Sequence, residues 1–184
     1  MDITTERLLL RQWRNDDLPA YAALAGDPRV AEFFPFPLPA RVAYEQANAI
    51  RKHVDENGWG GWAVEVIGKV PFAGWVGLGP PDFGPHAPPF KHVAPCIEIG
   101  WRLAYDCWGH GYATEAAIAA ARFGFETLGL QEIISFAPMG NLRSRRVMSK
   151  LGMTHDPNED FYHPCAPPNH PLGPCALYRL PKPE

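Results

Sequence analysis

Residues 96 to 116 read Cys96-Ile-Glu-Ile-Gly-Trp-Arg-Leu-Ala-Tyr-Asp-Cys-Trp-Gly-His-Gly-Tyr-Ala-Thr-Glu-Ala116. The first part, from Ile97 to Leu103, is apolar enough to form a central strand. From Ala113 onward the apolar residues recur with a helical period. These residues are Ile118, Ala121, Phe125 and Leu128. The stretch therefore predicts a strand, a short glycine-containing loop and a helix, in that order.

The loop Gly109-His110-Gly111 lies directly before the predicted helix. The first backbone N–H groups of a helix have no partner inside it, and together with the positive end of the helix dipole they bind phosphate oxygens. The loop lacks a Gly-Lys-Ser/Thr ending, which argues against a nucleoside-triphosphate loop. Two glycines alone also serve tight turns that bind nothing, so this loop is a candidate phosphate cradle that needs support from elsewhere.

A second strand and helix follow. The strand is predicted over Gln131 to Ala137, and Asn141 is a good N-cap for the helix after it. Gly152 occupies the place of a left-handed residue just past the helix end. The apolar stripe of this helix is Val147, Met148 and Leu151.

These two motifs resemble those of the GNAT superfamily of acyl-CoA-dependent N-acetyltransferases, and within it the RimJ/RimL-like branch. The matching segments are Trp108-Gly-His-Gly-Tyr-Ala-Thr-Glu-Ala116 and Asn141-x-x-Ser144-x-x-Val-Met-x-Lys150-Leu-Gly-Met153. Thr5–Arg11 and Ala176–Leu180 resemble the first and last strands of that branch. The resemblance covers nearly the whole chain. It implies an α/β (α+β) fold with a mixed, mostly antiparallel sheet flanked by helices, whose central strand pair splays to admit the acyl-CoA arm.

The remaining elements fit the same plan. A strand is predicted over Leu8 to Trp13, with Asn15-Asp16-Asp17 as a helix cap before Leu18 to Ala25. A longer helix is predicted from Pro39 to about Glu56, ended by Gly58. The other predicted segments are a hairpin of Trp62–Ile67 and Phe72–Leu78 around Gly68-Lys69, an aromatic stretch at Arg29–Leu38, and a long loop at Gly79–Pro95.

The overall composition is that of a globular protein. With 184 residues, of which 46% are hydrophobic and 20% charged, the chain is long enough for one domain over residues 1–184 and too short for two ordinary ones. A net charge of -3 favours neither nucleic acid nor an anionic membrane as partner. Because the chain shows neither a membrane span nor a signal-peptide core, we expect a cytoplasmic protein.

The four cysteines show no framework spacing and are expected to be free thiols. A zinc site is conceivable in the proline-rich segment before the last strand, but no Cys-x-x-Cys pair supports it, so no metal is expected. The ligands of such a site would be His163, Cys165, His170 and Cys175.

The resemblance implies that acetyl-CoA is the acyl donor and that a primary amine is the acceptor. The acceptor would be a protein N-terminal α-amine or a small-molecule amine, and transfer would be direct, without a covalent enzyme intermediate. No cysteine lies in a recognisable nucleophile motif, which agrees with direct transfer. The cofactor-binding residues implied are Leu103, Trp108, Gly109, His110, Gly111, Tyr112, Ala113, Thr114, Asn141 and Ser144.

Two residues are candidates for proton transfer. Glu98, on the central strand, is the candidate base, since an inward carboxylate would have a raised pKa. It lies on the face opposite to Ile97 and Ile99, and an outward-facing or salt-bridged glutamate is the alternative. Ser144 is the candidate proton donor to the leaving thiolate, or a residue that supports the first helical turn. Likewise, Asn141 could bind the cofactor, cap the helix, or do both.

Some features leave alternatives open. Asp106 stands where many members of the superfamily have Gln or Arg, and an inward acid there would repel a pyrophosphate. Three competing functions remain open. They are a non-catalytic acyl-CoA-binding module, a phosphate-ester or nucleotide-binding protein, and an enzyme for longer acyl chains. Exposed Trp and Phe side chains would favour a homodimer. A basic helix face could meet a ribose phosphate or simply be solvated, and its members are Arg143, Arg145, Arg146 and Lys150.

Overall fold

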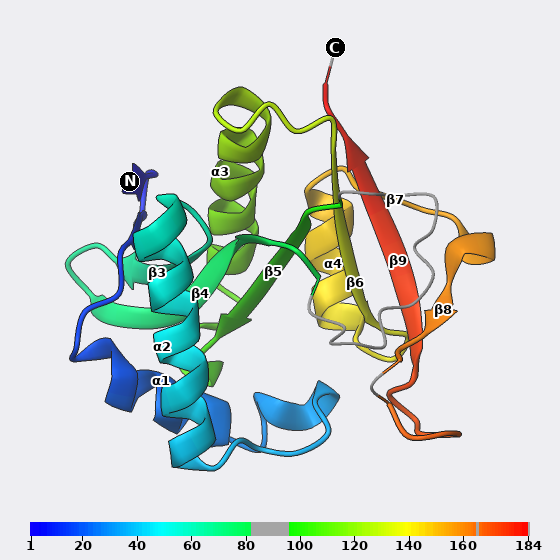
Figure 1. The fold of residues 1–184 in the computed structure, drawn as a ribbon, viewed down its shortest axis with the longest axis horizontal. Coiled ribbons are helices and arrows are strands. Elements are labelled where there is room, and N and C mark those ends of the chain that lie inside the picture. The colour runs from blue at the N-terminus through cyan, green and yellow to red at the C-terminus, as the bar shows by residue number, and fades with distance from the viewer. Residues whose placement is uncertain (82–95, 165, 184) are drawn as a thin grey trace.

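The computed structural model describes residues 1–81, 96–164 and 166–183. Most of the predicted loop at Gly79–Pro95, and Cys165, therefore lie outside the described residues. The described strands form one sheet in the order β1-β2-β3-β4-β5-β6-β9-β7, with β8 paired to β9 (Figure 1). The strands are β1 (Ile3–Thr4), β2 (Leu8–Arg11), β3 (Gly61–Val66), β4 (Val70–Gly79), β5 (Glu98–Leu103), β6 (Glu132–Pro138), β7 (Thr154–His155), β8 (Phe161–Tyr162) and β9 (Pro174–Pro181).

Helices cover both faces of this sheet. The helices are α1 (Asp17–Gly26), α2 (Ala40–Asn57), α3 (Tyr112–Glu126) and α4 (Leu142–Lys150). One core is formed between the sheet and α3 with α4, and it includes Ile99 and Met148. The second lies between the sheet and α1 with α2, and it includes Trp13 and Tyr21. The mixed fold expected from the sequence is confirmed.

The helix after the glycine loop packs through small residues. Ile118, predicted to belong to its buried face, is 44% exposed, so that part of the pattern was wrong. A Cβ atom on Gly124 would meet side-chain carbons of Leu78 and Ile133 at 3.0 and 3.1 Å. The helix therefore lies so close to the sheet that its contact face is built mainly of Ala and Gly. The buried residues are Ala116, Ala117, Ala120, Ala121, Gly124 and Phe125.

The two central strands separate shortly after they meet. β5 and β6 run parallel and pair at Glu98 and Ile134, whereas the other pairs of the described sheet are antiparallel. One residue further, the Ser135 hydroxyl donates a hydrogen bond of 2.8 Å to the Ile99 carbonyl. Beyond this bond the strands diverge (Figure 1). The splayed central pair expected from the resemblance is present.

The cap predicted before α1 differs from the structure. Asp16 occupies the N-cap position without a side-chain hydrogen bond, and Asp17 turns its carboxylate back into the core. There it forms an ion pair of 2.7 Å with Arg11, whose side chain is 2% exposed. Arg11 also pairs with Glu65 at 2.8 Å. Because a buried guanidinium needs counter-charges, Asp17 serves the core instead of the helix end.

The predicted helix ends and turns are largely confirmed. Gly58 adopts a left-handed φ of 76° after α2, and Gly68 adopts 70° between β3 and β4. The short strands β7 and β8 were not predicted, because two residues carry too little pattern. The described part of the chain contains no helix long and apolar enough to cross a membrane.

Candidate active site

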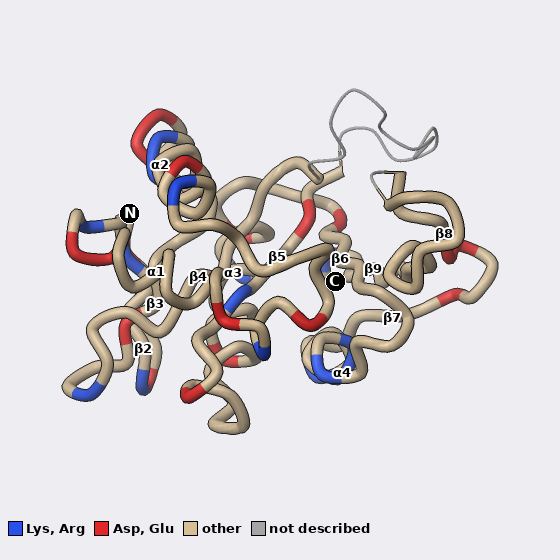
Figure 2. The backbone as a smooth tube through the Cα atoms, turned by 90° about the horizontal axis from the view of Figure 1, so that it is seen from below, with Lys and Arg blue, Asp and Glu red and all other residues tan. Residues whose placement is uncertain are grey.

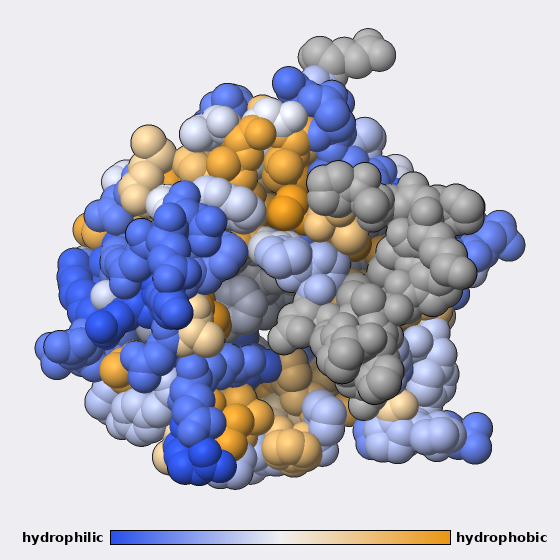
Figure 3. Space-filling view, in the orientation of Figure 1, coloured by the Kyte–Doolittle hydropathy of each residue, from blue (hydrophilic) through white to orange (hydrophobic). Residues whose placement is uncertain are grey.

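Two cavities open where β5 and β6 part. The first, of about 340 Å³, lies between β5, the start of α3 and α4. The second, of about 560 Å³, lies on the other side of β5, under the aromatic segment after α1. We call the first the loop groove and the second the strand cavity. The molecular surface is hollowed near the centre of the face in Figure 3. The polar residues in the walls of both cavities are Arg102, Asn141 and Ser144.

Backbone geometry at the start of α3 fits a phosphate cradle. Gly109 and Gly111 have φ of 79° and 83°, which side chains other than that of Gly rarely allow. Gly111 is the N-cap and provides no side chain to the first N–H groups of α3. The loop groove is therefore lined by amide donors at the positive end of a helix. The predicted residues in its wall are Leu103, Trp108, Gly109, Gly111, Tyr112, Ala113, Thr114, Asn141 and Ser144.

His110 and Asp106 lie differently from these residues. The His110 side chain is absent from the described groove wall and stacks on the Tyr112 ring, with centroids 5.4 Å apart. Asp106 is exposed and its charge acts on Arg29. The acid that would repel a pyrophosphate thus lies outside the described groove wall.

Arg7 holds the glycine loop in place, a role that the sequence did not reveal. Its Nη1 donates a hydrogen bond of 3.0 Å to the His110 carbonyl, and its Nη2 forms an ion pair of 2.6 Å with Glu115. The guanidinium also lies 5.0 Å from the centre of the Tyr112 ring. Thr5 donates to the same Glu115 carboxylate at 2.6 Å. The segment before β2 therefore fixes the loop from the outside.

The free edge of β5 faces the loop groove. The Ile99 carbonyl points toward β6, and strand alternation gives the backbone of Trp101 and Leu103 the same direction. The Leu103 carbonyl accepts a hydrogen bond of 2.9 Å from Trp108 Nε1. The Trp101 backbone and the Leu103 N–H therefore face the groove near the predicted position around Leu103, where an extended ligand can pair with them.

The start of α4 forms the opposite wall of the groove. The Asn141 side-chain oxygen accepts a hydrogen bond of 3.1 Å from the Ser144 amide, which confirms the predicted N-cap. Its amide nitrogen retains donors for a ligand.

Figure 2 shows basic positions clustered on α4, and their side chains have different roles. Arg143 pairs with Glu32 and lies 4.8 Å from the centre of the Trp108 ring. Arg145 donates to the Met139 carbonyl at 3.1 Å and supports the chain before the helix. Two further basic residues line the loop groove, Arg146 and Lys150.

The strand cavity contains the candidate base. Alternate residues on one face of β5 line this cavity, and they are Glu98, Gly100 and Arg102. A Cβ atom on Gly100 would lie 3.3 Å from the Trp75 ring, which therefore covers this position. The sequence left open on which face of the sheet the Glu98 side chain lies, and in the structure it lies on the face of the strand cavity.

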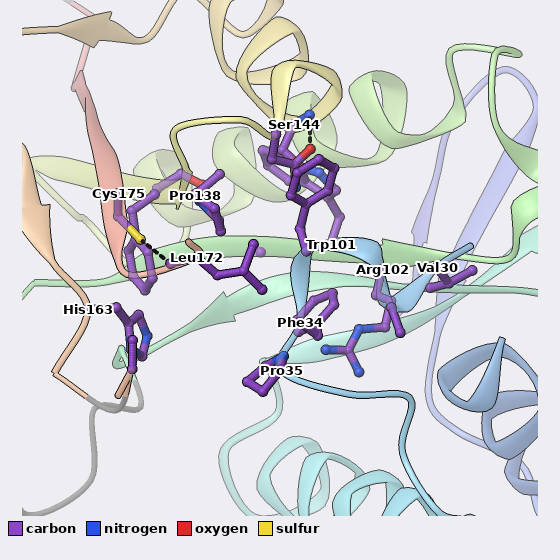
Figure 4. Close-up of a pocket in the computed structure, with 18 of the residues that line it drawn as sticks. Val30, Phe34, Pro35, Trp101, Arg102, Pro138, Ser144, His163, Leu172 and Cys175 are labelled. Carbon is purple, nitrogen blue, oxygen red and sulfur yellow. Dashed lines mark hydrogen bonds between the residues drawn. The ribbon is translucent and has the colours of Figure 1, made fainter. Parts of the chain in front are cut away.

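The far end of the cavity contains His163 and Cys175 (Figure 4). Burial lowers the pKa of His163 and raises the pKa of Cys175 to about 12. The Cys175 thiol therefore stays protonated at neutral pH, in keeping with transfer without a covalent enzyme intermediate. The described cysteines, Cys96, Cys107 and Cys175, are free thiols. The described residues contain no group of three or more potential metal ligands, and Cys165 lies outside them.

Comparison with known proteins identifies the family. A family model described as an acetyltransferase (GNAT) domain matches residues 7–154. The chain belongs to the GNAT acetyltransferase family. GNAT enzymes use acetyl-CoA, so this protein is an acetyl-CoA-dependent acyltransferase.

Individual GNAT relatives agree with this assignment. The chain is 32% identical over 136 residues to FsC-acetyl coenzyme A-N(2)-transacetylase of Aspergillus fumigatus, covering 70% of this chain and 54% of that protein. It is 30% identical over 173 residues to the uncharacterized N-acetyltransferase YnaD of Bacillus subtilis, covering 91% and 89%. The chain thus spans about half the length of the first relative and most of the second.

Solved GNAT structures share the fold. A GNAT acetyltransferase from Bacillus anthracis superposes with a TM-score of 0.77 at 27% identity, covering 99% of both chains. The ribosomal L7/L12 α-N-protein acetyltransferase RimL, solved in complex with coenzyme A, has a TM-score of 0.73 at 12% identity, covering 98% of both chains. The second likeness concerns the fold alone.

Several residues of this GNAT site were not found from the sequence. Gln46, on α2, lines the strand cavity, and the buried Tyr21, on α1, donates a hydrogen bond to Gln46; no local motif marks either residue. Arg102 could have been found, because it stands four residues after Glu98 on a strand and therefore shares its face.

Proposed function

We propose that this enzyme is a RimJ/RimL-like member of the family and transfers the acetyl group of acetyl-CoA directly to a primary amine. The acceptor is either a protein N-terminal α-amine or a small-molecule amine. The observation that supports the proposal is the pair of cavities that meet at one wall, formed by Trp101, Arg102, Asn141 and Ser144. A donor in the loop groove and an acceptor in the strand cavity would come together at this wall.

Acetyl-CoA supplies a thioester, and the residues of the loop groove would hold it. The amide groups from Gly109 to Thr114 would bind the pyrophosphate, and the Trp101 backbone with the Asn141 amide nitrogen would bind the extended arm. Arg146 and Lys150, at the groove wall, offer positive charge to a further phosphate. Positioning of this kind accounts for a large part of the rate of a two-substrate reaction.

Glu98 would accept a proton from the amine, directly or through a water molecule. Its side chain lies in the wall of the strand cavity, on the same face of β5 as Arg102. An α-amine of pKa ~8 costs about 1.4 kcal/mol to deprotonate at pH 7, whereas a lysine-like amine costs about 4.6 kcal/mol. The importance of Glu98 therefore depends on the acceptor.

Ser144 would donate a proton to the departing thiolate. Its side chain lies in the wall shared by both cavities. A thiolate whose conjugate acid has a pKa of ~8.5 leaves without much help, so we expect Ser144→Ala to lower kcat by only a few-fold. Single-turnover measurement with acetyl-CoA checks this, and a loss of a thousandfold or more would assign Ser144 a larger role.

Thiol release from acetyl-CoA tests the proposed function. The purified protein is offered short peptides, amino acids, polyamines and aminoglycosides, and the products are identified by mass spectrometry. We expect turnover with one class of amine. Binding of acetyl-CoA without turnover of any amine would contradict the proposal, and so would acetylation of the protein's own cysteines as an obligatory step.

A further inference from the structure

Arg102 places a positive charge in the wall of the strand cavity without an acidic partner among the described residues. Its Nη1 donates a hydrogen bond of 3.2 Å to the Tyr21 hydroxyl. Its guanidinium carbon lies 3.7 Å from the centre of the Phe34 ring, and Figure 4 shows the two side chains next to each other. The buried Nε has no hydrogen-bond partner in the described part of the chain.

The groups around this guanidinium form a chain of donors. The Tyr21 hydroxyl accepts from Arg102 and donates to Gln46 Oε1 at 2.5 Å. Since the oxygen of Gln46 is used in this way, its amide nitrogen is the group left for a ligand. Gln46 and Arg102 both line the cavity, so this part of the wall offers N–H donors.

This arrangement is costly unless an anion binds. A guanidinium stays charged in proteins, and burial without a counter-charge is unfavourable. Burial lowers the pKa of Arg102, and Tyr21 opposes this effect only in part. Arg11, the arginine that the described residues bury in the core, has two acidic partners, Asp17 and Glu65. Glu98, on the same face of β5, stands about 13 Å away along the strand.

We infer that the acceptor is an amine that carries a carboxylate, and that Arg102 binds this carboxylate. The inference rests on the proposed function and names its substrate class. A planar guanidinium binds a carboxylate through parallel hydrogen bonds, and the Gln46 amide adds a further donor. Aromatic side chains also line this cavity, so an amino acid with an apolar side chain fits it. They are Phe33, Phe34, Phe36, Trp75 and Trp101. Polyamines and aminoglycosides would meet a like charge.

Matched acceptors test the inference. Phenylalanine, phenylalaninamide and phenethylamine differ at the carboxylate position, and kcat/KM for each is corrected for the fraction of free amine. We expect phenylalanine to be preferred by at least tenfold over both others. The variant Arg102→Met should reduce this preference to below threefold, and Arg102→Lys should retain part of it. Arg122→Met, which removes a cation on the exposed side of α3, is the control.

The outcomes separate the inference from the proposed function. Equal rates for the three acceptors would overturn the inference and leave amine acetylation standing. A preference that survives in Arg102→Met would also overturn it. If no amine is turned over, the proposed function fails, but calorimetry in the presence of coenzyme A still decides the inference. N-acetylphenylalanine should then bind at least tenfold more tightly than N-acetylphenethylamine. This difference should be found only in proteins that retain Arg102. Equal melting temperatures of the variants show that the fold is kept, and their KM for acetyl-CoA shows that the loop groove is intact.

Discussion

At the scale of single residues, the face on which Glu98 lies decides what it can do. Strand alternation leaves two choices, and the burial of Ile99 against α3 directs Glu98 to the strand cavity. The sequence supplied the alternation. It could not supply the burial, because that depends on which helix packs on which face. The sequence therefore predicted Glu98 as a candidate site residue but left open which of the two faces of the sheet it lies on.

Replacement of Glu98 by Gln should affect acceptors according to their amine pKa. The base can lower the barrier by at most the free energy of deprotonation. At pH 7 this free energy corresponds to a rate factor of about ten for an α-amine and of about 2,500 for a lysine-like amine. We expect Glu98→Gln to lower kcat/KM by no more than these factors, and a rise in pH to restore the variant's rate. Rate against pH with one acceptor of each kind checks this, and equal losses for both kinds would contradict it.

At the scale of elements, the turn from β5 into α3 depends on more than its own sequence. The two glycines and the helix start were predicted from local pattern. The clamp by Arg7 and Glu115 was not, because it joins residues 108 positions apart and no period or motif connects them. The same holds for Arg102 and Tyr21, which come from different layers.

Gly111→Ala should weaken acetyl-CoA binding. A Cβ atom at this left-handed position costs about 1 kcal/mol and would touch Arg7 Nη2 at 3.4 Å, so the substitution strains the backbone of the loop beside the side chain that holds it. We expect KM for acetyl-CoA to rise about tenfold. Gly129→Ala is the matched control, with φ of 70° and open space around the position. It should lose similar stability without a change in KM, and a similar rise in KM for both variants would refute the role of the loop.

At the scale of the whole molecule, the buried network around Arg11 joins several elements. Arg11, on β2, contacts Asp17 at the start of α1, Glu65 on β3 and the Pro71 carbonyl on β4. The sequence predicted these elements but assigned Asp17 to a helix cap. It could not show that Arg11 would be buried, since an arginine at a strand end is ordinarily exposed.

Arg11→Met should lower the free energy of unfolding by about 3–5 kcal/mol, because it leaves the Asp17 carboxylate buried without a cation. The double variant Arg11→Met/Asp17→Leu should recover part of this loss. Urea denaturation of the single and double variants measures both effects. If the double variant lost more free energy of unfolding than the two single variants lose together, the buried carboxylate would not be the cause.

The parting of β5 and β6 has a thermodynamic consequence. Within the described part of the chain, the two halves of the sheet share one paired position and one side-chain hydrogen bond. An extended ligand seated between them would complete hydrogen bonding that the strands leave open. Such a ligand binds the native state alone, and at a hundred times its Kd it adds about 2.7 kcal/mol to the stability. We expect coenzyme A to raise the melting temperature by about 5–10 °C and to slow hydrogen exchange at the Trp101 amide. Pyrophosphate alone should raise the melting temperature weakly and leave exchange at the Trp101 amide unchanged. The enzyme would then be at its most rigid when it is loaded, and its lifetime in a cell would follow the supply of its own acyl donor.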